Sequence, residues 1–244
     1  GGEELGDLPR RETLLLLQLL YNEVHQERPR LQEALVRLMD EATASQTPAM
    51  ETYAMADEIG SGSWGKVVLA WDNYLRRHVA IKEIRQDVIE EEILQEFLKE
   101  ARILASMPYN ANVITIHRLK RTRDGRWQIV MELVQGQDLE AYVEEQGPRP
   151  LEEALDVVIQ GLNGLQAAWK AGVVHKDVKP ANFLRAADGT IKVVDFGLAE
   201  RVTETLHYEG VRGTPAYLAP EVAQGQRATH QSDIYSLGVV LFFL

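Results

Sequence analysis

The sequence predicts an α+β protein of two lobes, preceded by a helical segment. Short β-rich runs occupy residues 53–134, and helical patterns dominate residues 135–244. Two amphipathic patterns, followed by a polar linker, fill residues 1–52. A β-rich unit followed by a helical unit is typical of α+β architecture. We therefore expect a helical hairpin and linker, a β-rich lobe ending in a connecting hinge, and a helical lobe, within these three ranges.

The composition is that of a globular protein with an acidic balance. The chain has 244 residues, 45% of them hydrophobic, and a formal net charge of -11. This length can form more than one packed unit, and the negative charge argues against nucleic acid as a partner. With no cysteine, disulfides and thiolate metal sites are excluded, as expected for a reducing, cytoplasmic compartment. No apolar run approaches the roughly 20 residues of a membrane span, and we expect no signal peptide.

Residues 8–45 carry the two amphipathic patterns. Apolar residues recur at helical spacing before and after Pro29, a residue favoured at a helix start. Two interpretations remain open. We favour a helical hairpin packed on the neighbouring lobe, and the alternative is an element for partner docking or self-association. The apolar positions are Leu14, Leu15, Leu17, Leu20 and Val24, then Leu31, Ala34, Leu35, Leu38 and Met39.

The first lobe is expected to contain five strands and one helix. Runs of β-branched and other apolar residues bounded by turns predict the strands, and apolar residues sharing one face predict the helix. The dipeptide Asp124-Gly125 predicts a hairpin turn between the last two strands. The expected strands are 53–60, 65–71, 78–84, 112–119 and 127–133, and the expected helix is 87–106.

Two motifs of this lobe suit phosphate binding. Gly60, Gly62 and Gly65 lie where one expected strand ends and the next begins, and glycines there let backbone N–H groups approach phosphate oxygens. Taken alone, a flexible hairpin turn explains them equally well. Lys82 ends the apolar strand Val-Ala-Ile-Lys and needs an anionic partner if it is buried. Glu100 on the following helix is our choice for that carboxylate, with Glu96 as the alternative.

The second lobe carries two segments suited to phosphoryl transfer. Residues 171–184 read AGVVHKDVKPANFL, and residues 194–198 read VDFGL. They supply two carboxylates, an amide and an ammonium group, from Asp177, Asp195, Asn182 and Lys179. Phosphoryl transfer depends mostly on positioning and charge neutralisation, and these are the groups it requires.

Together these motifs resemble a known family, the eukaryotic-type (Hanks-type) protein kinases. The resemblance covers residues 53–244 and includes the ordered motifs Gly-rich loop, Val-Ala-Ile-Lys, His-Lys-Asp, Asp-Phe-Gly and Ala-Pro-Glu. Lys179 together with Gly213-Thr214-Pro215 is similar to the Ser/Thr branch, and the wording is closest to bacterial members. The resemblance implies a two-lobed kinase fold that uses ATP and Mg²⁺, with Mn²⁺ as an alternative, and phosphorylates serine or threonine of a protein substrate.

The resemblance also implies roles for individual residues. Asp177 would orient the substrate hydroxyl and accept its proton, and Lys179 would neutralise the moving phosphoryl group. Asn182 and Asp195 would hold the metal, while Lys82, braced by Glu100, would hold the inner phosphates. The glycines Gly60, Gly62 and Gly65 would cover the phosphates. The residues implied around adenine and ribose are Ile59, Val67, Ala80, Met131, Glu132, Leu133, Val134, Asp138 and Leu184. An apolar column would contain Leu104, Ile116, His175 and Phe196.

Two features depart from the family pattern. Lys176 stands where the family usually has an arginine, which puts control by phosphorylation of the loop after Asp195 in doubt; Thr203, Thr205 and Tyr208 are the candidate sites. Thr214 is expected to be a structural contact of Asp177 and Lys179. The chain stops at Leu244 within an apolar helix, so we expect an incomplete second lobe. The alternative function is a pseudokinase-like scaffold acting through the N-terminal helices, which the four intact polar motif residues disfavour.

Overall fold

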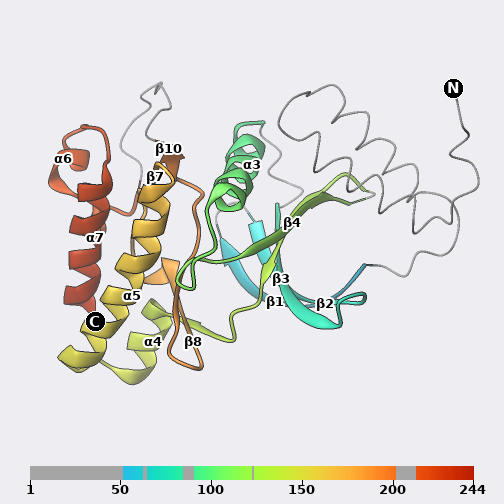
Figure 1. Cartoon of the computed structure of the whole chain (residues 1–244), viewed down its shortest axis with the longest axis horizontal. Helices are drawn as coiled ribbons and strands as arrows, with labels where there is room; N and C mark the ends of the chain where they lie inside the picture. The colour runs from blue at the N-terminus through green and yellow to red at the C-terminus, as the bar shows by residue number, and fades with distance from the viewer. Residues whose placement is uncertain (1–51, 63–64, 85–90, 123, 202–212) are drawn as a thin grey trace, which may run out of the picture. The chain divides into compact units, whose positions relative to one another are not determined.

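Five antiparallel strands form the larger sheet of the protein, in the order β1-β2-β3-β5-β4 (Figure 1). The computed structural model describes residues 52–62, 65–84, 91–122, 124–201 and 213–244. The expected helices within residues 8–45 and the candidate phosphorylation sites lie outside these ranges. The strands are β1 (Tyr53–Gly62), β2 (Gly65–Asp72), β3 (Arg77–Ile84), β4 (Ile116–Arg121) and β5 (Trp127–Glu132).

The central strand β3 owes its position to its apolar sequence. It pairs with β2 on one side and β5 on the other, and Val79 and Ile81 are fully buried. Lys82 follows them in the same strand and is 22% exposed at its side chain. The turn between β4 and β5 contains Gly125 at φ 89, a backbone conformation that favours glycine. The expected strands are therefore present, although β4 begins at Ile116 rather than at residue 112.

One helix of this half, α3 (Glu91–Ser106), packs against the sheet. Phe97 and Ala101 lie one turn apart and are buried with Ile84 of β3 and Ile129 of β5. This helical spacing is the reason the pattern could be recognised in the sequence. The helix was expected to begin at residue 87, but residues 85–90 are outside the described ranges.

The second half contains helices and several very short strands. The helices are α4 (Leu139–Gln146), α5 (Leu151–Lys170), α6 (Pro220–Ala223) and α7 (His230–Phe243), with two 3₁₀ turns, η2 (Pro180–Asn182) and η3 (Pro215–Tyr217). The strands are β6 (Gly136–Asp138), β8 (Phe183–Ala186) and β9 (Ile191–Val193), which pair as β6-β8-β9, and β7 (Val173–Val174), which pairs with β10 (Glu200–Arg201). The prediction of a mainly helical half missed these strands, because a strand of two to four residues shows too few alternations to be recognised in the sequence.

The long helix α5 runs beside α7 (Figure 1) and carries the core of this half. Two glycines of α5 allow it to pack closely on β8 and on the segment before β4. A Cβ atom at Gly161 would meet the Phe183 ring at 2.8 Å, and one at Gly164 would collide with the carbonyl oxygen of Asn112. The α+β fold class is thus confirmed, and the helical N-terminal segment stays a prediction. Among the described residues, no helix has the length and apolarity to cross a membrane.

Candidate active site

Asp177 lies at the centre of a dense polar cluster. Its Oδ2 is 2.8 Å from Lys179 Nζ and accepts from Asn182 Nδ2 at 3.2 Å. Its Oδ1 accepts from the backbone N–H and the hydroxyl of Thr214 at 3.0 and 2.9 Å. Lys179 also donates to Thr214 Oγ1 at 3.1 Å. The contact expected of Thr214 is therefore present, and the four donors match the acceptor capacity of one carboxylate.

A buried carboxylate on α7 binds the backbone of the loop that carries Asp177. Asp233 is 1% exposed, and its two oxygens accept from the backbone N–H groups of His175 and Lys176 at 2.9 and 3.0 Å. The indole of Trp169 donates to Oδ2 at 2.9 Å. Lys176 has φ 72, the left-handed region that non-glycine residues seldom adopt. Three donors to Asp233 thus hold a strained backbone immediately before Asp177.

Lys82 joins the sheet to the Asp-Phe-Gly segment. Its Nζ lies 2.9 and 2.7 Å from the two carboxylate oxygens of Glu100, and 3.2 Å from Asp195 Oδ1. Of the two glutamates considered, Glu100 is therefore the residue in contact with Lys82. Glu100 is buried, which requires the compensating charge that Lys82 supplies.

The charge states of this cluster follow from its geometry. Burial alone would lower the pKa of Lys82, but the carboxylates of Glu100 and Asp195 outweigh burial and raise that pKa above its ordinary value. Burial also acts to raise the pKa of Asp195, but Lys82 outweighs it and holds that pKa below its ordinary value. At neutral pH the cluster therefore contains an ammonium group and an ionised Asp195.

His175 and Phe196 connect the two clusters through packing. Their rings lie 4.7 Å apart, and Leu104 and Phe196 belong to one buried core that Ile116 packs against. His175 accepts from the Asp177 backbone N–H with Nδ1, so its Nε2 donates to Val194 O at 3.1 Å. The imidazole is thus engaged on both sides, as its structural interpretation expects. Asp195 itself has φ 59, a second left-handed non-glycine residue at the site.

The glycine-rich run forms the hairpin between β1 and β2, in which Gly62 pairs with Gly65. A Cβ atom at Gly65 would collide with the carbonyl oxygen of Glu83, so this position requires glycine for close strand packing. Residues 63–64 at the tip lie outside the described ranges. Sequence reasoning assigned these glycines to phosphate binding, which stays a prediction, and the structure shows that Gly65 is needed for strand packing.

The residues expected around the adenine come from both halves. Ala80 pairs with Met131 between β3 and β5, and Leu184 pairs with Asp138 between β8 and β6. Ile59 is half exposed. Asp138 caps α4, because its Oδ1 accepts from Ala141 N at 2.9 Å. One oxygen of the residue expected to reach the ribose is therefore already used by the fold. Val67 lies in β2, and Glu132, Leu133 and Val134 lie at and after the end of β5.

A residue that sequence reasoning missed contacts the hinge. Lys192 of β9 lies 2.9 Å from Glu132 Oε1 and donates to the carbonyl oxygen of Ala111 at 3.0 Å. The same Oε1 accepts from Thr115 N at 2.7 Å. A lone lysine in a short strand has no local sequence signal for such a contact, because its partners lie 60 and 81 positions away along the chain.

The donor set at Asn182 and Asp195 fits a hard cation that is held together with phosphates. Asn182 donates with its amide nitrogen to the carboxylate and carbonyl oxygens of Asp177, so its amide oxygen is the atom left to act as a ligand. The Asp195 side chain is 48% exposed and carries a negative charge. The described residues contain no group of three or more His, Asp or Glu suited to a metal. Magnesium commonly uses one or two protein ligands plus substrate phosphates and water.

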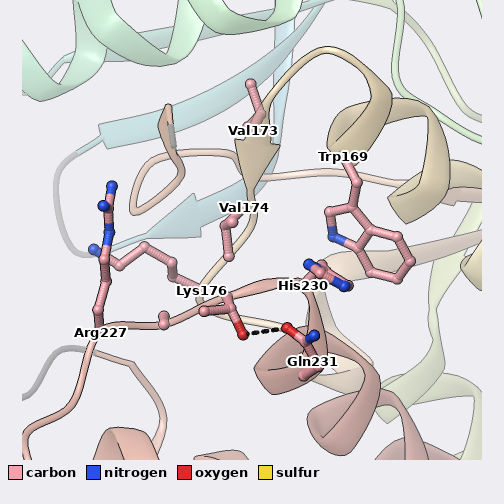
Figure 2. Close-up of a pocket in the computed structure, with 9 residues that line it drawn as sticks. Trp169, Val173, Val174, Lys176, Arg227, His230 and Gln231 are labelled. Carbon is pink, nitrogen blue, oxygen red and sulfur yellow. Dashed lines mark hydrogen bonds between the residues drawn. The ribbon is translucent and has the colours of Figure 1, made fainter. Parts of the chain in front are cut away.

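A cavity of about 200 Å³ lies next to the loop of Asp177, and Figure 2 shows the residues that line it. Trp169, Val173 and Val174 form one wall, and His230 lies near the indole, with ring centroids 5.9 Å apart. Lys176 and Arg227 line the other end. None of these residues except Lys176 was singled out from the sequence. The cavity matters here because its wall contains the Trp169 indole that supports Asp233.

Comparison with known proteins identifies the family. The model of the protein kinase domain matches residues 53–244. The chain is 40% identical over 195 residues to the serine/threonine-protein kinase PrkC of Bacillus subtilis, covering 79% of this chain and 30% of that protein. It is 39% identical over 194 residues to the serine/threonine-protein kinase PknA of Mycobacterium tuberculosis, covering 77% of this chain and 45% of that protein.

A third relative is the probable serine/threonine-protein kinase PknB of Lactococcus lactis, 35% identical over 198 residues, with 80% of this chain and 31% of that protein covered. The chain thus spans between about a third and a half of the length of these curated relatives. The match to the family model covers most of the chain and includes every motif described above. The chain therefore belongs to the protein kinase domain family, in its eukaryotic-type (Hanks-type) serine/threonine branch.

Proposed function

We propose that the chain is an ATP-dependent serine/threonine protein kinase. It transfers the γ-phosphoryl group of ATP to the hydroxyl of a serine or threonine in a protein substrate. The observation that carries this proposal is the contact set of Asp177, which gathers Lys179, Asn182 and Thr214 around one carboxylate. Its link to the second cluster is short, because Val194 N, next to Asp195, donates to Asn182 O at 3.0 Å.

In this proposal Asp177 orients the incoming hydroxyl and accepts its proton as the new P–O bond forms. The four donors on Asp177 mean that the hydroxyl must replace or share one of them. The Thr214 hydroxyl is the natural one to yield, because it is neutral and its backbone N–H keeps Oδ1 engaged. Lys179, whose Nζ lies 2.8 Å from Asp177 Oδ2, neutralises charge on the transferred group.

Lys82 holds the inner phosphates of the nucleotide, and Glu100 keeps the ammonium in place. The raised pKa of Lys82 supports this assignment, since it maintains the positive charge. Asn182 and Asp195 hold Mg²⁺, for which Mn²⁺ can substitute, and the metal supplies charge neutralisation at the phosphates. The backbone at Gly60, Gly62 and Gly65 covers the phosphates.

The adenine lies between the two halves of the fold in this proposal, against apolar side chains and the hinge backbone. Glu132 and Val134 supply the hinge hydrogen bonds, and Asp138 faces the ribose. The apolar positions are Ile59, Val67, Ala80, Met131 and Leu184.

The acceptor class follows from Lys179 and Thr214, whose contact is typical of the Ser/Thr branch, and from the names of the relatives. A reaction that consumes ATP takes place where ATP is abundant, so we infer a cytoplasmic location for the domain. Docking of a partner, or self-association, through residues 8–45 is part of the proposal. The scaffold alternative has less support, because all four polar motif residues are present. Lys82 contacts Asp195, and Asn182 contacts Asp177.

The experiment is phosphate transfer from radiolabelled ATP to a generic basic protein, with the full chain and its Asp177→Asn variant. We expect phosphoserine or phosphothreonine, a turnover lowered by roughly 10²–10⁴ in the variant, and unchanged MgADP affinity. The matched control is Asp156→Asn on α5, which alters an exposed carboxylate that accepts from Gln160 of its own helix. Equal turnover in wild type and Asp177→Asn would refute the mechanism.

A further inference from the structure

One ammonium group ties together three segments that surround the proposed nucleotide site. Lys192 Nζ lies 2.9 Å from Glu132 Oε1 at the hinge and 3.0 Å from the carbonyl oxygen of Ala111 in the segment between α3 and β4. The lysine side chain is 13% exposed and the glutamate side chain 25%. Partly buried ion pairs are screened less than surface pairs, so this contact can constrain the positions of its partners.

The segment that supplies Ala111 is itself anchored to the second half of the fold. The next residue, Asn112, donates with its side chain to Ile191 O at 2.8 Å, and its carbonyl oxygen accepts from Val193 N at 2.9 Å. Ile114 N donates to Val193 O at 3.0 Å. These bonds do not involve Lys192. The hinge is joined to the same segment through its backbone, because Glu132 N donates to Thr115 O at 2.9 Å. Lys192 adds a contact from β9 to the Glu132 side chain.

β9 also leads directly to the metal-binding end of the proposed site. Val194 and Asp195 follow it, and Asp195 contacts Lys82 at 3.2 Å. The Lys192 side chain thus connects the strand that positions Asp195 with the hinge that would bond the adenine. Among the described residues, the contact with Lys192 is the ion pair that joins Glu132 to the second half.

We propose that Lys192 is a positioning residue, which acts through Glu132 to set the hinge relative to Asp195. The inference rests on the proposed nucleotide site, because its consequence is for ligands that must reach both ends of that site. The adenine of a nucleoside diphosphate would contact the hinge. Its phosphates, with the metal, would contact Asp195 and Lys82. Adenosine has no phosphate and reaches only the hinge end.

This difference separates positioning from a general loss of structure. If the hinge is held less firmly relative to Asp195, a ligand that spans both ends must restrict the added freedom when it binds, and its affinity falls. A ligand at one end has no such cost. Loss of the Lys192–Glu132 contact should therefore weaken the binding of MgADP selectively and leave the affinity for adenosine unchanged.

The test measures the dissociation constants of MgADP and adenosine by calorimetry, for the wild-type full chain and Lys192→Met. Methionine keeps the length and apolar stem of lysine and removes its charge. We expect the MgADP constant to rise roughly three- to tenfold, the range for losing one partly buried ion pair, with adenosine unchanged within about twofold. Lys170→Met is the matched control, since Lys170 is exposed on α5 and bonds Gln166 of the same helix.

A second variant tests the route through the hinge. Glu132→Gln removes the charge but keeps an oxygen that can accept from Thr115 N, the 2.7 Å contact of the wild type. If Lys192 acts through Glu132, Lys192→Met should have little additional effect on MgADP affinity in the Glu132→Gln background. Independent, additive losses would contradict that route.

The possible outcomes are distinct. This inference would be overturned if Lys192→Met weakened the binding of MgADP and adenosine equally, or if it did not weaken the binding of MgADP. The proposed kinase function would then still stand. A wild-type protein that binds neither MgADP nor adenosine would instead refute the proposed function on which the inference rests.

Discussion

Trp169→Phe tests whether an indole outside the recognised motifs supports the loop of Asp177. Trp169 Nε1 donates at 2.9 Å to Oδ2 of Asp233, the buried carboxylate that also accepts from His175 N and Lys176 N. Phenylalanine keeps an aromatic ring in the wall of the cavity in Figure 2 and removes only the donor and part of the ring. The smaller ring fits without a clash.

The expected loss can be worked out from these contacts. A hydrogen bond to a charged group contributes about 1.5–3 kcal/mol, and removing its donor leaves the acceptor less satisfied. Asp233 Oδ2 keeps the His175 N–H, so we expect the lower part of this range, about 1.5–2 kcal/mol. For a domain of this size, that corresponds to a melting temperature lower by about 3–8 °C. Turnover should also fall, because a looser loop places Asp177 less accurately.

Urea denaturation and steady-state kinetics together provide the measurement. The matched control is Trp127→Phe in β5, a half-buried tryptophan that contacts Arg121 and whose ring nitrogen has no hydrogen-bond partner among the described residues. It should lose less stability and retain its turnover. If Trp169→Phe costs less than about 0.5 kcal/mol, or no more than the control, the support of Asp233 by the indole is refuted.

Further predictions concern packing and pH. Gly164→Ala should destabilise the fold by about 1–3 kcal/mol in urea denaturation, because the new Cβ collides with the Asn112 carbonyl, whereas Gly238→Ala in α7 meets no atom within 4 Å and should stabilise by up to about 1 kcal/mol; the opposite ranking would contradict the packing argument. Lys82 lowers the pKa of Asp195, so the stability from this pair should be complete above the ordinary aspartate pKa of about 3.9 and be lost as pH falls through the lower folded value. The stability difference between wild type and Asp195→Asn should therefore shrink only in acid, and a difference that is constant from neutral pH to pH 3 would count against the ion pair.

The parts of the fold that could be predicted are those with repeated local signals. The strand of Val79 and Ile81 is central and buried, and such strands read as continuous apolar runs. Helix α3 was recognisable because Phe97 and Ala101 recur on one face. The short strands β7 and β10 were missed, since two residues cannot show a period, and their pairing joins positions 173–174 with 200–201.

The same distinction applies to the candidate site. Asp177, Lys179 and Asn182 lie within one loop, so their types and spacing indicate their chemistry directly. The choice between Glu96 and Glu100 could not be settled by spacing, because both lie on similar faces of one helix. It depends on how α3 is rotated against β3, which tertiary packing decides. The 2.7 Å contact of Lys82 with Glu100 therefore required the structure.

The residues that were missed share one physical property. Trp169 and Lys192 do not resemble catalytic groups, and each acts on a motif through a contact made elsewhere in the chain: Trp169 through Asp233, and Lys192 through Glu132. Phosphoryl transfer depends mainly on positioning, so supports of this kind contribute to the proposed reaction through the groups they hold in place. A motif can be intact in sequence while its geometry depends on single distant side chains. Substitutions at Trp169 or Lys192 should therefore lower activity while every motif residue is kept, an effect that a comparison of the motifs alone cannot reveal.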